Sequence, residues 1–212
     1  MGVLMDGFTI KSARFITSVG LDGEYPKKLS AEIAVVGKSN VGKSSLINTL
    51  CNNYKLARIS QTPGKTRLIN FFAINSEFYL VDLPGYGFAK APKTEQAKWG
   101  ALMEAYLSSG RLTHIIMLID IRHAPTAEDK QMFGWIVYYG VPFTLVATKA
   151  DKIAVSKRKQ AANAAAKALG APPFAIPFSS ETRQGKQQLL DVIGAVAADA
   201  ARADSPALEI KV

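Results

Sequence analysis

Six short apolar runs alternate along the chain with longer stretches of mixed polarity, and this alternation predicts the elements. Continuous apolar runs bounded by turn residues are typical of strands that are buried on both faces of a sheet. The runs cover 31–37, 68–74, 78–85, 113–120, 142–149 and 173–180. The stretches between them favour helices, over 43–51, 95–109, 126–139, 157–169 and 185–201.

This order predicts an α/β fold of three layers, in which helices cover both faces of a mostly parallel sheet of about six strands. Only a few residues around Asn75 and Ser76 join the runs at 68–74 and 78–85. Such a short link suits a hairpin rather than a crossover, so we expect one antiparallel strand at an edge of the sheet.

The same pattern divides the chain into three parts. Residues 1–30 are expected to be a lead-in that packs on the domain, with a candidate short strand near Arg14–Val19. Residues 31–200 form the main domain, and residues 201–212 are expected to be a flexible tail. No segment between them has the composition of a linker.

Composition excludes several classes of protein. The 212 residues are 48% hydrophobic and 20% charged, which is ordinary for a globular protein and excludes a wholly disordered one. The single cysteine, Cys51, excludes a small disulfide-rich scaffold and fits a buried apolar position in a reducing compartment. Because no apolar run reaches the ~18 residues of a membrane span and the start does not resemble a secretory signal, we expect a cytoplasmic protein without a membrane partner.

The charge balance suggests a polyanionic partner. The 26 lysines and arginines against 17 acidic residues give a net charge of +9. A basic soluble protein of this size often binds nucleic acid or ribonucleoprotein, although a basic surface without a specific partner is the alternative.

The most specific motif follows the first apolar run. It fits the pattern G-x-x-x-x-G-K-[ST] of a phosphate-binding loop, with a strand before it and a helix after it. Backbone N–H groups and the helix N-terminus would face the phosphates, the lysine would reach the β- and γ-phosphates, and the serine would bind Mg²⁺. The residues are Gly37, Lys38, Ser39, Asn40, Val41, Gly42, Lys43 and Ser44.

A second motif ends the run at 78–85, with Asp82, Leu83, Pro84 and Gly85. The aspartate could hold Mg²⁺ through water, and the glycine N–H could reach a γ-phosphate. A plain strand-ending turn is the alternative reading, but the position after a buried strand favours the metal. The polar segment 60–68 lies between the two motifs and offers either Thr62 or Thr66 as a further Mg²⁺ ligand, a choice that spacing leaves open.

Thr148, Lys149, Ala150 and Asp151 follow the run at 142–149 and suggest a guanine pocket. A carboxylate there can accept both N1–H and the N2 amino group of guanine, which adenine cannot offer. A helix N-cap at Asp151 is the alternative. Backbone N–H groups near the end of the last run could contact the base oxygen; the residues there are Phe178, Ser179 and Ser180.

In finer detail, the stretches GKSNVGKSSLIN, TPGKTRLINFF, VDLPGYGFAK, DIRHAP and ATKADK resemble the EngB family of bacterial ribosome-biogenesis GTP-binding proteins. The resemblance runs from about Arg14 to about Val196. It implies a phosphate-loop NTPase fold, binding of GTP and GDP with Mg²⁺, and a role in large-subunit assembly, cell division and septation. Thr148 stands where many other GTPases carry asparagine, and the family shares this threonine.

The resemblance also selects Thr66 as the magnesium threonine, beside Ser44 and Asp82. It places the nucleotide-binding part of the polar segment at Gly64, Lys65, Thr66, Arg67 and Leu68.

Slow intrinsic hydrolysis is expected, because Tyr86 stands where many GTPases carry a water-orienting glutamine. A potassium ion is a candidate to supply the missing charge, with Asn40 as its ligand; the alternative is that Asn40 only braces its loop. The residues predicted to take part in catalysis are Lys43, Thr66, Gly85 and Asn40.

Basic residues gather near the predicted loops, which by itself is also typical of a solvated rim. The resemblance favours GTP-dependent binding to the ribosomal RNA and proteins of a large-subunit precursor, with salt-sensitive phosphate contacts. No exposed heptad pattern indicates pairing, so we expect a monomer. The basic residues are Lys55, Arg58, Lys65, Arg67, Lys90, Lys93, Lys98, Lys152, Lys157, Arg158 and Lys159.

Two rival functions remain open at this point. One is an ATPase or nucleotide kinase, against which Asp151 argues because it suits guanine. The other is a non-catalytic RNA-binding scaffold that holds nucleotide, against which the intact Lys43, Ser44 and Asp82 argue.

Overall fold

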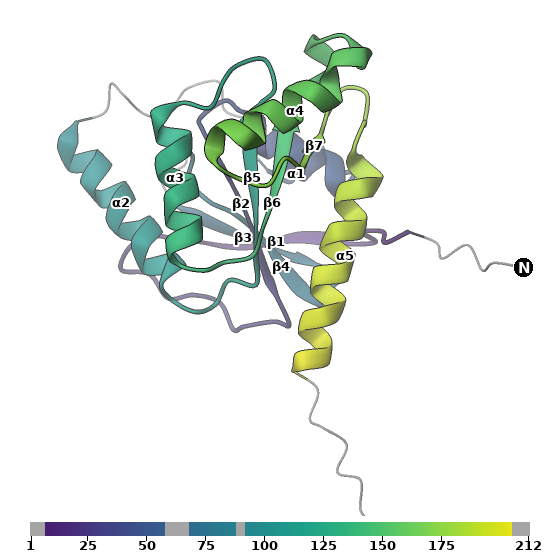
Figure 1. Ribbon diagram of the computed structural model, residues 1–212. Helices are drawn as coiled ribbons and strands as arrows, with labels where there is room; N and C mark the ends of the chain where they lie inside the picture. The colour runs from purple at the N-terminus through teal and green to yellow at the C-terminus, as the bar shows by residue number, and fades with distance from the viewer. Residues whose placement is uncertain (1–6, 58–67, 88–91, 205–212) are drawn as a thin grey trace, which may run out of the picture.

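The computed structural model describes residues 7–57, 68–87 and 92–204. Over these ranges, a sheet of seven strands is covered on both faces by helices (Figure 1). The strands are β1 (Ala13–Val19), β2 (Glu32–Gly37), β3 (Ile69–Ile74), β4 (Phe78–Asp82), β5 (His114–Asp120), β6 (Phe143–Thr148) and β7 (Ala175–Pro177). The helices are α1 (Lys43–Leu50), α2 (Lys93–Leu107), α3 (Ala127–Tyr138), α4 (Val155–Leu169) and α5 (Lys186–Ala203), with a 3-10 turn η1 (Ala150–Lys152).

One strand of the sheet runs against the others. In the order β1-β3-β4-β2-β5-β6-β7, the pairs from β4 to β7 are parallel, whereas β3 is antiparallel to both of its neighbours. The predicted hairpin is confirmed as β3–β4. Its turn contains Asn75 and Ser76, which have positive φ angles of 51° and 61°. The antiparallel strand lies next to the edge rather than at it, because β1 pairs outside it.

The lead-in supplies this seventh strand, so the expectation of about six strands was one too low. β1 pairs with β3 from Ala13↔Ile74 to Val19↔Ile69, with a bulge between Phe15 and Thr17. This strand confirms the candidate strand near Arg14–Val19. Only one of its seven residues is buried, so it was not among the six continuous apolar runs. At the other end of the chain, α5 continues to Ala203, into the segment expected to be a tail.

Two apolar cores lie on the two faces of the sheet. Helices α2, α3 and α4 cover one face, with Met103, Ile136 and Ala166 in its core. Helices α1 and α5 cover the other face, with Leu46 and Ile193 in its core. The predicted three-layer arrangement is therefore confirmed.

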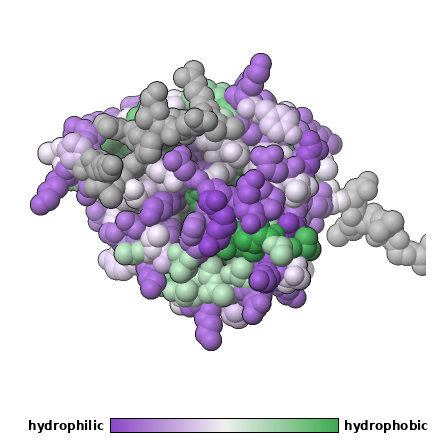
Figure 2. All heavy atoms as spheres, turned by 90° about the horizontal axis from the view of Figure 1, so that it is seen from above, coloured by the Kyte–Doolittle hydropathy of each residue, from purple (hydrophilic) through white to green (hydrophobic). Residues whose placement is uncertain are grey.

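The strand order places a crevice above the centre of the sheet. β2 lies between β4 and β5, and the chain passes from one side of β2 to the other after β4. Ligands of open α/β sheets bind where the strand order reverses, outside the carboxyl ends of the strands. Figure 2 looks down on this end of the molecule, and the described surface there is mostly hydrophilic. Over the described residues, no helix has the length and apolarity needed to cross a membrane.

Candidate functional site

The loop between β2 and α1 has the backbone of a phosphate loop. At Gly37 a Cβ atom would lie 2.7 Å from Val41 Cγ1 and 3.0 Å from Leu118 Cβ, so no side chain fits there. Gly42 has a φ of 110°, which L side chains rarely adopt. Gly42 is also the N-cap of α1 and provides no side-chain hydrogen bond to the first turn. The N-terminal N–H groups of α1 are thus left for an anionic ligand.

Lys43 begins α1 and pairs with Asp82 at the end of β4. The distance from Lys43 Nζ to Asp82 Oδ1 is 2.5 Å, and both side chains are at most 10% exposed. β4 is hydrogen-bonded in parallel to β2 with Val35 opposite Asp82, which brings the carboxylate to the phosphate loop. Triphosphate oxygens at this loop would compete with Asp82 for the ammonium group and leave the carboxylate to bind a cation.

The donors near this pair suit magnesium. Ser44 offers a hydroxyl and Asp82 a carboxylate, both hard oxygen ligands of the kind that Mg²⁺ prefers. No group of three or more His, Cys, Asp or Glu residues that could hold a metal exists among the residues described. The chain alone therefore provides part of a coordination shell, which phosphate oxygens and water would complete. Thr66, the third predicted ligand, and its neighbours Gly64, Lys65 and Arg67 lie outside the described residues, whereas Leu68 is described and partly exposed.

The segment after Asp82 packs directly on the phosphate loop. A Cβ atom at Gly85 would lie 3.2 Å from Ser39 Oγ and 3.3 Å from Gly37 O. Ser39 N–H donates to Tyr86 O at 2.9 Å, and Lys38 and Tyr86 form a parallel bridge. Leu83 is completely buried, and Pro84 O accepts a hydrogen bond from Trp99 Nε1 on α2. Gly85 is thereby held where its N–H could meet a γ-phosphate.

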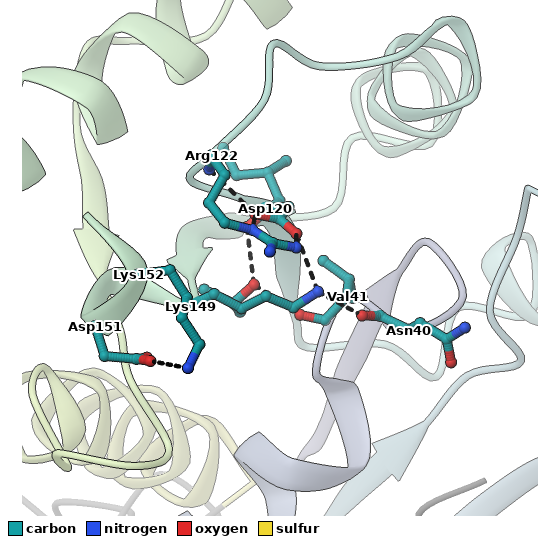
Figure 3. Close-up of polar contacts among 9 residues, drawn as sticks. Asn40, Val41, Asp120, Arg122, Lys149, Asp151 and Lys152 are labelled. Atoms are coloured by element: carbon teal, nitrogen blue, oxygen red, sulfur yellow. Dashed lines mark hydrogen bonds and ion pairs between the residues drawn. The ribbon is translucent and has the colours of Figure 1, made fainter. Parts of the chain in front are cut away.

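The base motif is tied to the same loop. Thr148 Oγ1 donates to Val41 O at 2.7 Å, and Lys149 Nζ donates to Asn40 O at 2.8 Å (Figure 3). Lys149 has a φ of 60°, which turns the chain at the end of β6. Its side chain therefore crosses from the base motif to the phosphate loop, as expected for a lysine whose stem lies over a base.

Asp151 follows in η1 and is fixed by two neighbours. Its Oδ1 accepts from Ser179 Oγ at 2.7 Å, and Lys152 Nζ lies 3.0 Å from its Oδ2. Burial acts to raise the pKa of the Asp151 carboxyl, but the hydrogen bonds from Ser179 and Lys152 outweigh it and the pKa is lowered. The side chain is thus an anionic acceptor near neutral pH, as guanine recognition requires.

The residues of the last predicted segment, 178–180, have two different roles. Phe178 is buried in the core, its N–H donates to Ala147 O, and its C=O accepts from Ala150 N. Both of its backbone groups are therefore used within the fold. Ser179 contacts Asp151, while the side chain of Ser180 is half-buried beside it. The structure thus places the serines nearest the candidate base pocket and gives Phe178 a supporting position.

Asp120, at the end of β5, is a site residue that sequence reasoning missed. Its carboxylate accepts from Arg122 Nη2 at 2.7 Å and pairs with Lys149 Nζ at 3.0 Å (Figure 3). Burial acts to raise its pKa, yet the hydrogen bonds from Arg122 and Lys149 hold the pKa well below its usual range. A cavity of about 260 Å³ lies here, between the phosphate loop and the loop after β5. The signal in the sequence was an acidic residue ending a buried strand, as at Asp82.

Comparison with known proteins agrees with this geometry. The profile of the family described as "50S ribosome-binding GTPase" matches residues 32–149, more than half of the chain. The "Probable GTP-binding protein EngB" of Clostridium perfringens (strain SM101 / Type A) is 50% identical over 187 residues, which cover 87% of this chain and 95% of that protein. The protein of the same name from Pelotomaculum thermopropionicum is 48% identical over 188 residues, with coverages of 87% and 95%.

Solved structures share the fold. A "probable GTP-binding protein engB" superposes with a TM-score of 0.66 at 23% identity, over 80% of this chain and 100% of that chain. Era in complex with MgGDPNP and nucleotides 1506–1542 of 16S ribosomal RNA gives a TM-score of 0.61 at 25% identity, over 78% of this chain and 56% of that chain.

The family match and the geometry together define the class: the protein is a phosphate-loop GTPase, an enzyme that binds GTP and hydrolyses it to GDP and phosphate. Within this class the assignment goes one step further. The chain belongs to the EngB family of GTP-binding proteins.

Proposed function

We propose that this GTPase is a nucleotide-dependent switch in the assembly of the large ribosomal subunit. The observation that carries the proposal is the direct packing of Gly85 and Tyr86 on the phosphate loop, with Trp99 of α2 hydrogen-bonded to the same segment. The γ-phosphate of bound GTP would act on this segment and, through it, on α2. The description of the family as ribosome-binding supports the identity of the partner. A cytoplasmic location and a need for the protein in cell division and septation belong to the same proposal.

The nucleotide would be held by three parts of the chain. We assign its phosphates to the loop from Gly37 to Ser44, its base to Thr148–Asp151 with Ser179 and Ser180, and its γ-phosphate to Gly85. Mg²⁺, when bound, would neutralise charge on the β- and γ-phosphates, and Ser44, Asp82 and Thr66 are its proposed protein ligands. The complex of Era with MgGDPNP supports the choice of metal.

Hydrolysis would depend on charge and position rather than on a side-chain base. Lys43 and the Gly85 N–H would stabilise charge that develops on the γ-phosphate, with Thr66 acting beside the metal. Tyr86 follows Gly85 and is 4% exposed, so its ring does not reach out to orient water. Slow intrinsic turnover follows, and a potassium ion held beside the phosphates by Asn40 is the proposed accelerator. Figure 3 shows the Asn40 side chain directed away from Lys149.

Exposed basic residues at the beginning of α4 are the proposed contact with ribosomal RNA. Lys152 in η1 and Lys157 and Lys159 in the first turns of α4 are exposed, and they follow the base motif at the end of β6. Phosphate contacts by such side chains make binding strongly dependent on salt. The RNA complex of Era supports the class of partner.

Co-sedimentation with separated ribosomal subunits tests the proposal. The protein should pellet with large subunits or their precursors in a non-hydrolysable GTP analogue, less so in GDP, and binding should fall steeply as salt rises. Lys157→Glu with Lys159→Glu should weaken it. The matched control is Lys27→Glu with Lys28→Glu, exposed lysines before β2 at the opposite end of the sheet. Equal binding in both nucleotides, or equal loss in both variants, would contradict the proposal.

A further inference from the structure

Tyr86 is fixed by a buried hydrogen bond to another element. Its hydroxyl donates to Asp129 Oδ1 on α3 at 2.8 Å, and the two residues are 4% and 6% exposed. Burial first, and then the neighbouring Asp129 carboxylate, raise the pKa of Tyr86 far above its usual value. The phenol therefore keeps its proton and remains a donor over the whole working range of pH.

Asp129 is itself held firmly, because it belongs to the first turn of α3. Its Oδ2 accepts from Thr126 N at 2.8 Å, and its backbone N–H donates to Thr126 Oγ1 at 3.4 Å; these two bonds form a capping box with the Thr126 N-cap. Thr126 Oγ1 also lies 2.9 Å from Asp129 Oδ2. A capping box ties the helix end to the residues before it. The acceptor of the Tyr86 hydroxyl is thus not a mobile surface carboxylate.

The same turn of α3 also reaches the phosphate loop. Glu128 pairs with Lys38 Nζ at 3.6 Å. The Lys38 backbone bridges to Tyr86, and a Cβ atom at Gly87 would lie 2.8 Å from Lys38 Cε. Two adjacent acidic residues of α3, Glu128 and Asp129, therefore contact the phosphate loop and residues 85–87. These are the two segments proposed to meet at the γ-phosphate.

The ring of Tyr86 is enclosed from the side of α2 as well. The Trp99 ring lies edge-on to it, with 6.4 Å between centroids, and Trp99 stacks on Trp135 of α3 at 5.9 Å. Loss of the Tyr86 hydroxyl would keep the ring against Trp99, remove the hydrogen bond to Asp129 and leave the buried Asp129 Oδ1 without this donor.

We propose that Asp129 is a positioning residue of the GTPase: by accepting the Tyr86 hydroxyl it fixes Gly85 against the phosphate loop and so raises the affinity for GTP relative to that for GDP. Gly85 serves only the γ-phosphate, which GDP lacks. Loosening Gly85 therefore weakens the binding of GTP and leaves that of GDP nearly unchanged. This inference rests on the proposed contact of Gly85 with the γ-phosphate and not on the ribosomal role.

Tyr86→Phe tests it directly. Dissociation constants for GDP and for a non-hydrolysable GTP analogue are measured with Mg²⁺ by calorimetry. The ratio of GTP-analogue to GDP affinity should fall by about tenfold, the order of one hydrogen bond to a carboxylate. The GDP affinity should change by less than about twofold, and single-turnover hydrolysis should slow.

The chain offers a matched control in Tyr106. Its hydroxyl is also buried and donates to a carboxylate, Glu32 Oε2, at 2.7 Å. Glu32 begins β2, at the end of the sheet away from the phosphate loop. Tyr106→Phe should therefore lower thermal stability to a similar extent but leave the GTP/GDP affinity ratio unchanged. The proposal is overturned if both variants move the ratio equally, or if Tyr86→Phe leaves it unchanged.

A second variant tests whether the effect passes through Asp129. Asp129→Asn weakens the acceptor, and its change in the affinity ratio should not add to that of Tyr86→Phe in the double variant. Additive changes would show that Asp129 acts by another route and would also overturn the proposal. If Tyr86→Phe fails to fold, the measurement on Asp129→Asn, with Tyr106→Phe as its control, decides alone.

Discussion

Thr148 at the end of β6 donates its hydroxyl to Val41 O in the phosphate loop, 107 positions away in the chain. The same hydroxyl oxygen lies 3.1 Å from Ile119 O on β5. A single buried threonine therefore joins the base motif, the phosphate loop and the central sheet. The hydroxyl in this place therefore helps to fix the shape of the site.

Replacing Thr148 by valine should weaken GDP and the GTP analogue alike. The change keeps the shape of the side chain but leaves Val41 O without its donor, which should cost about 1–3 kcal/mol of unfolding free energy. Denaturant unfolding and calorimetry check both effects. Thr144→Val, earlier on the same strand, is the control: it should affect stability while nucleotide affinity stays near that of the wild type. Loss of GTP-analogue affinity alone would contradict the argument.

Asp151→Asn should shift the base preference from guanine to xanthine. The amide can no longer accept two hydrogens from guanine, but it can donate to the 2-oxo group of xanthine. Mismatched buried polar groups discriminate by up to roughly 10⁴-fold, so GTP affinity should fall and xanthosine triphosphate should bind better than GTP. Competition binding measures the preference. Lys152→Met, which removes only a partly exposed partner of the carboxylate, should keep the preference for GTP.

Potassium should accelerate turnover if Asn40 holds it beside the phosphates. GTP hydrolysis should be faster in potassium than in sodium by on the order of tenfold or more, because a charge placed beside the transition state has effects of this size. Asn40 has a φ of 63°, so Asn40→Gly removes the side-chain oxygen without straining the backbone. This variant should lose the difference between the two salts while binding GDP normally. Equal wild-type rates in both salts would remove the ion from the mechanism.

Acid should destabilise the fold through His114. Burial lowers the pKa of this histidine, whose Nε2 lies 2.9 Å from Thr144 Oγ1. Below pH about 6.5 the unfolded chain binds a proton at this position that the folded chain resists, so stability falls as pH decreases. His114→Asn should flatten the pH dependence of unfolding, measured by denaturant titration as the pH decreases, and an unchanged slope would contradict the assignment to His114.

Much of this fold could be predicted because its strands are buried on both faces. The run 113–120 contains five consecutive apolar residues, Ile115 to Ile119, and β5 occupies His114–Asp120 within that run. The phosphate loop could also be predicted, because its backbone conformation requires glycines at fixed positions. Such a requirement is visible in the sequence as a short motif. The candidate strand near Arg14–Val19 is confirmed as β1, but it was not counted in the sheet because its side chains are mostly half-buried or exposed.

Contacts between motifs could not be predicted from the sequence, for a different reason. Tyr86 meets Asp129 over 43 positions, and Lys149 reaches Asn40 over 109. Such pairs depend on the order of strands in the sheet and on the rotation of α3, which periodicity does not encode. The sequence therefore predicted the parts of the site, and the strand order was needed to show which parts touch.

Cys51, just after α1, bears on how the molecule can be handled in the laboratory. It is the single cysteine of the chain, it is 8% exposed, and burial raises the pKa of its thiol to about 12. Thiol reagents attack the thiolate, so the natural sulfur should be slow to oxidise or to take up a label. A cysteine introduced at an exposed position, such as Lys157 on α4, could thus carry a dye while the native residue stays in place.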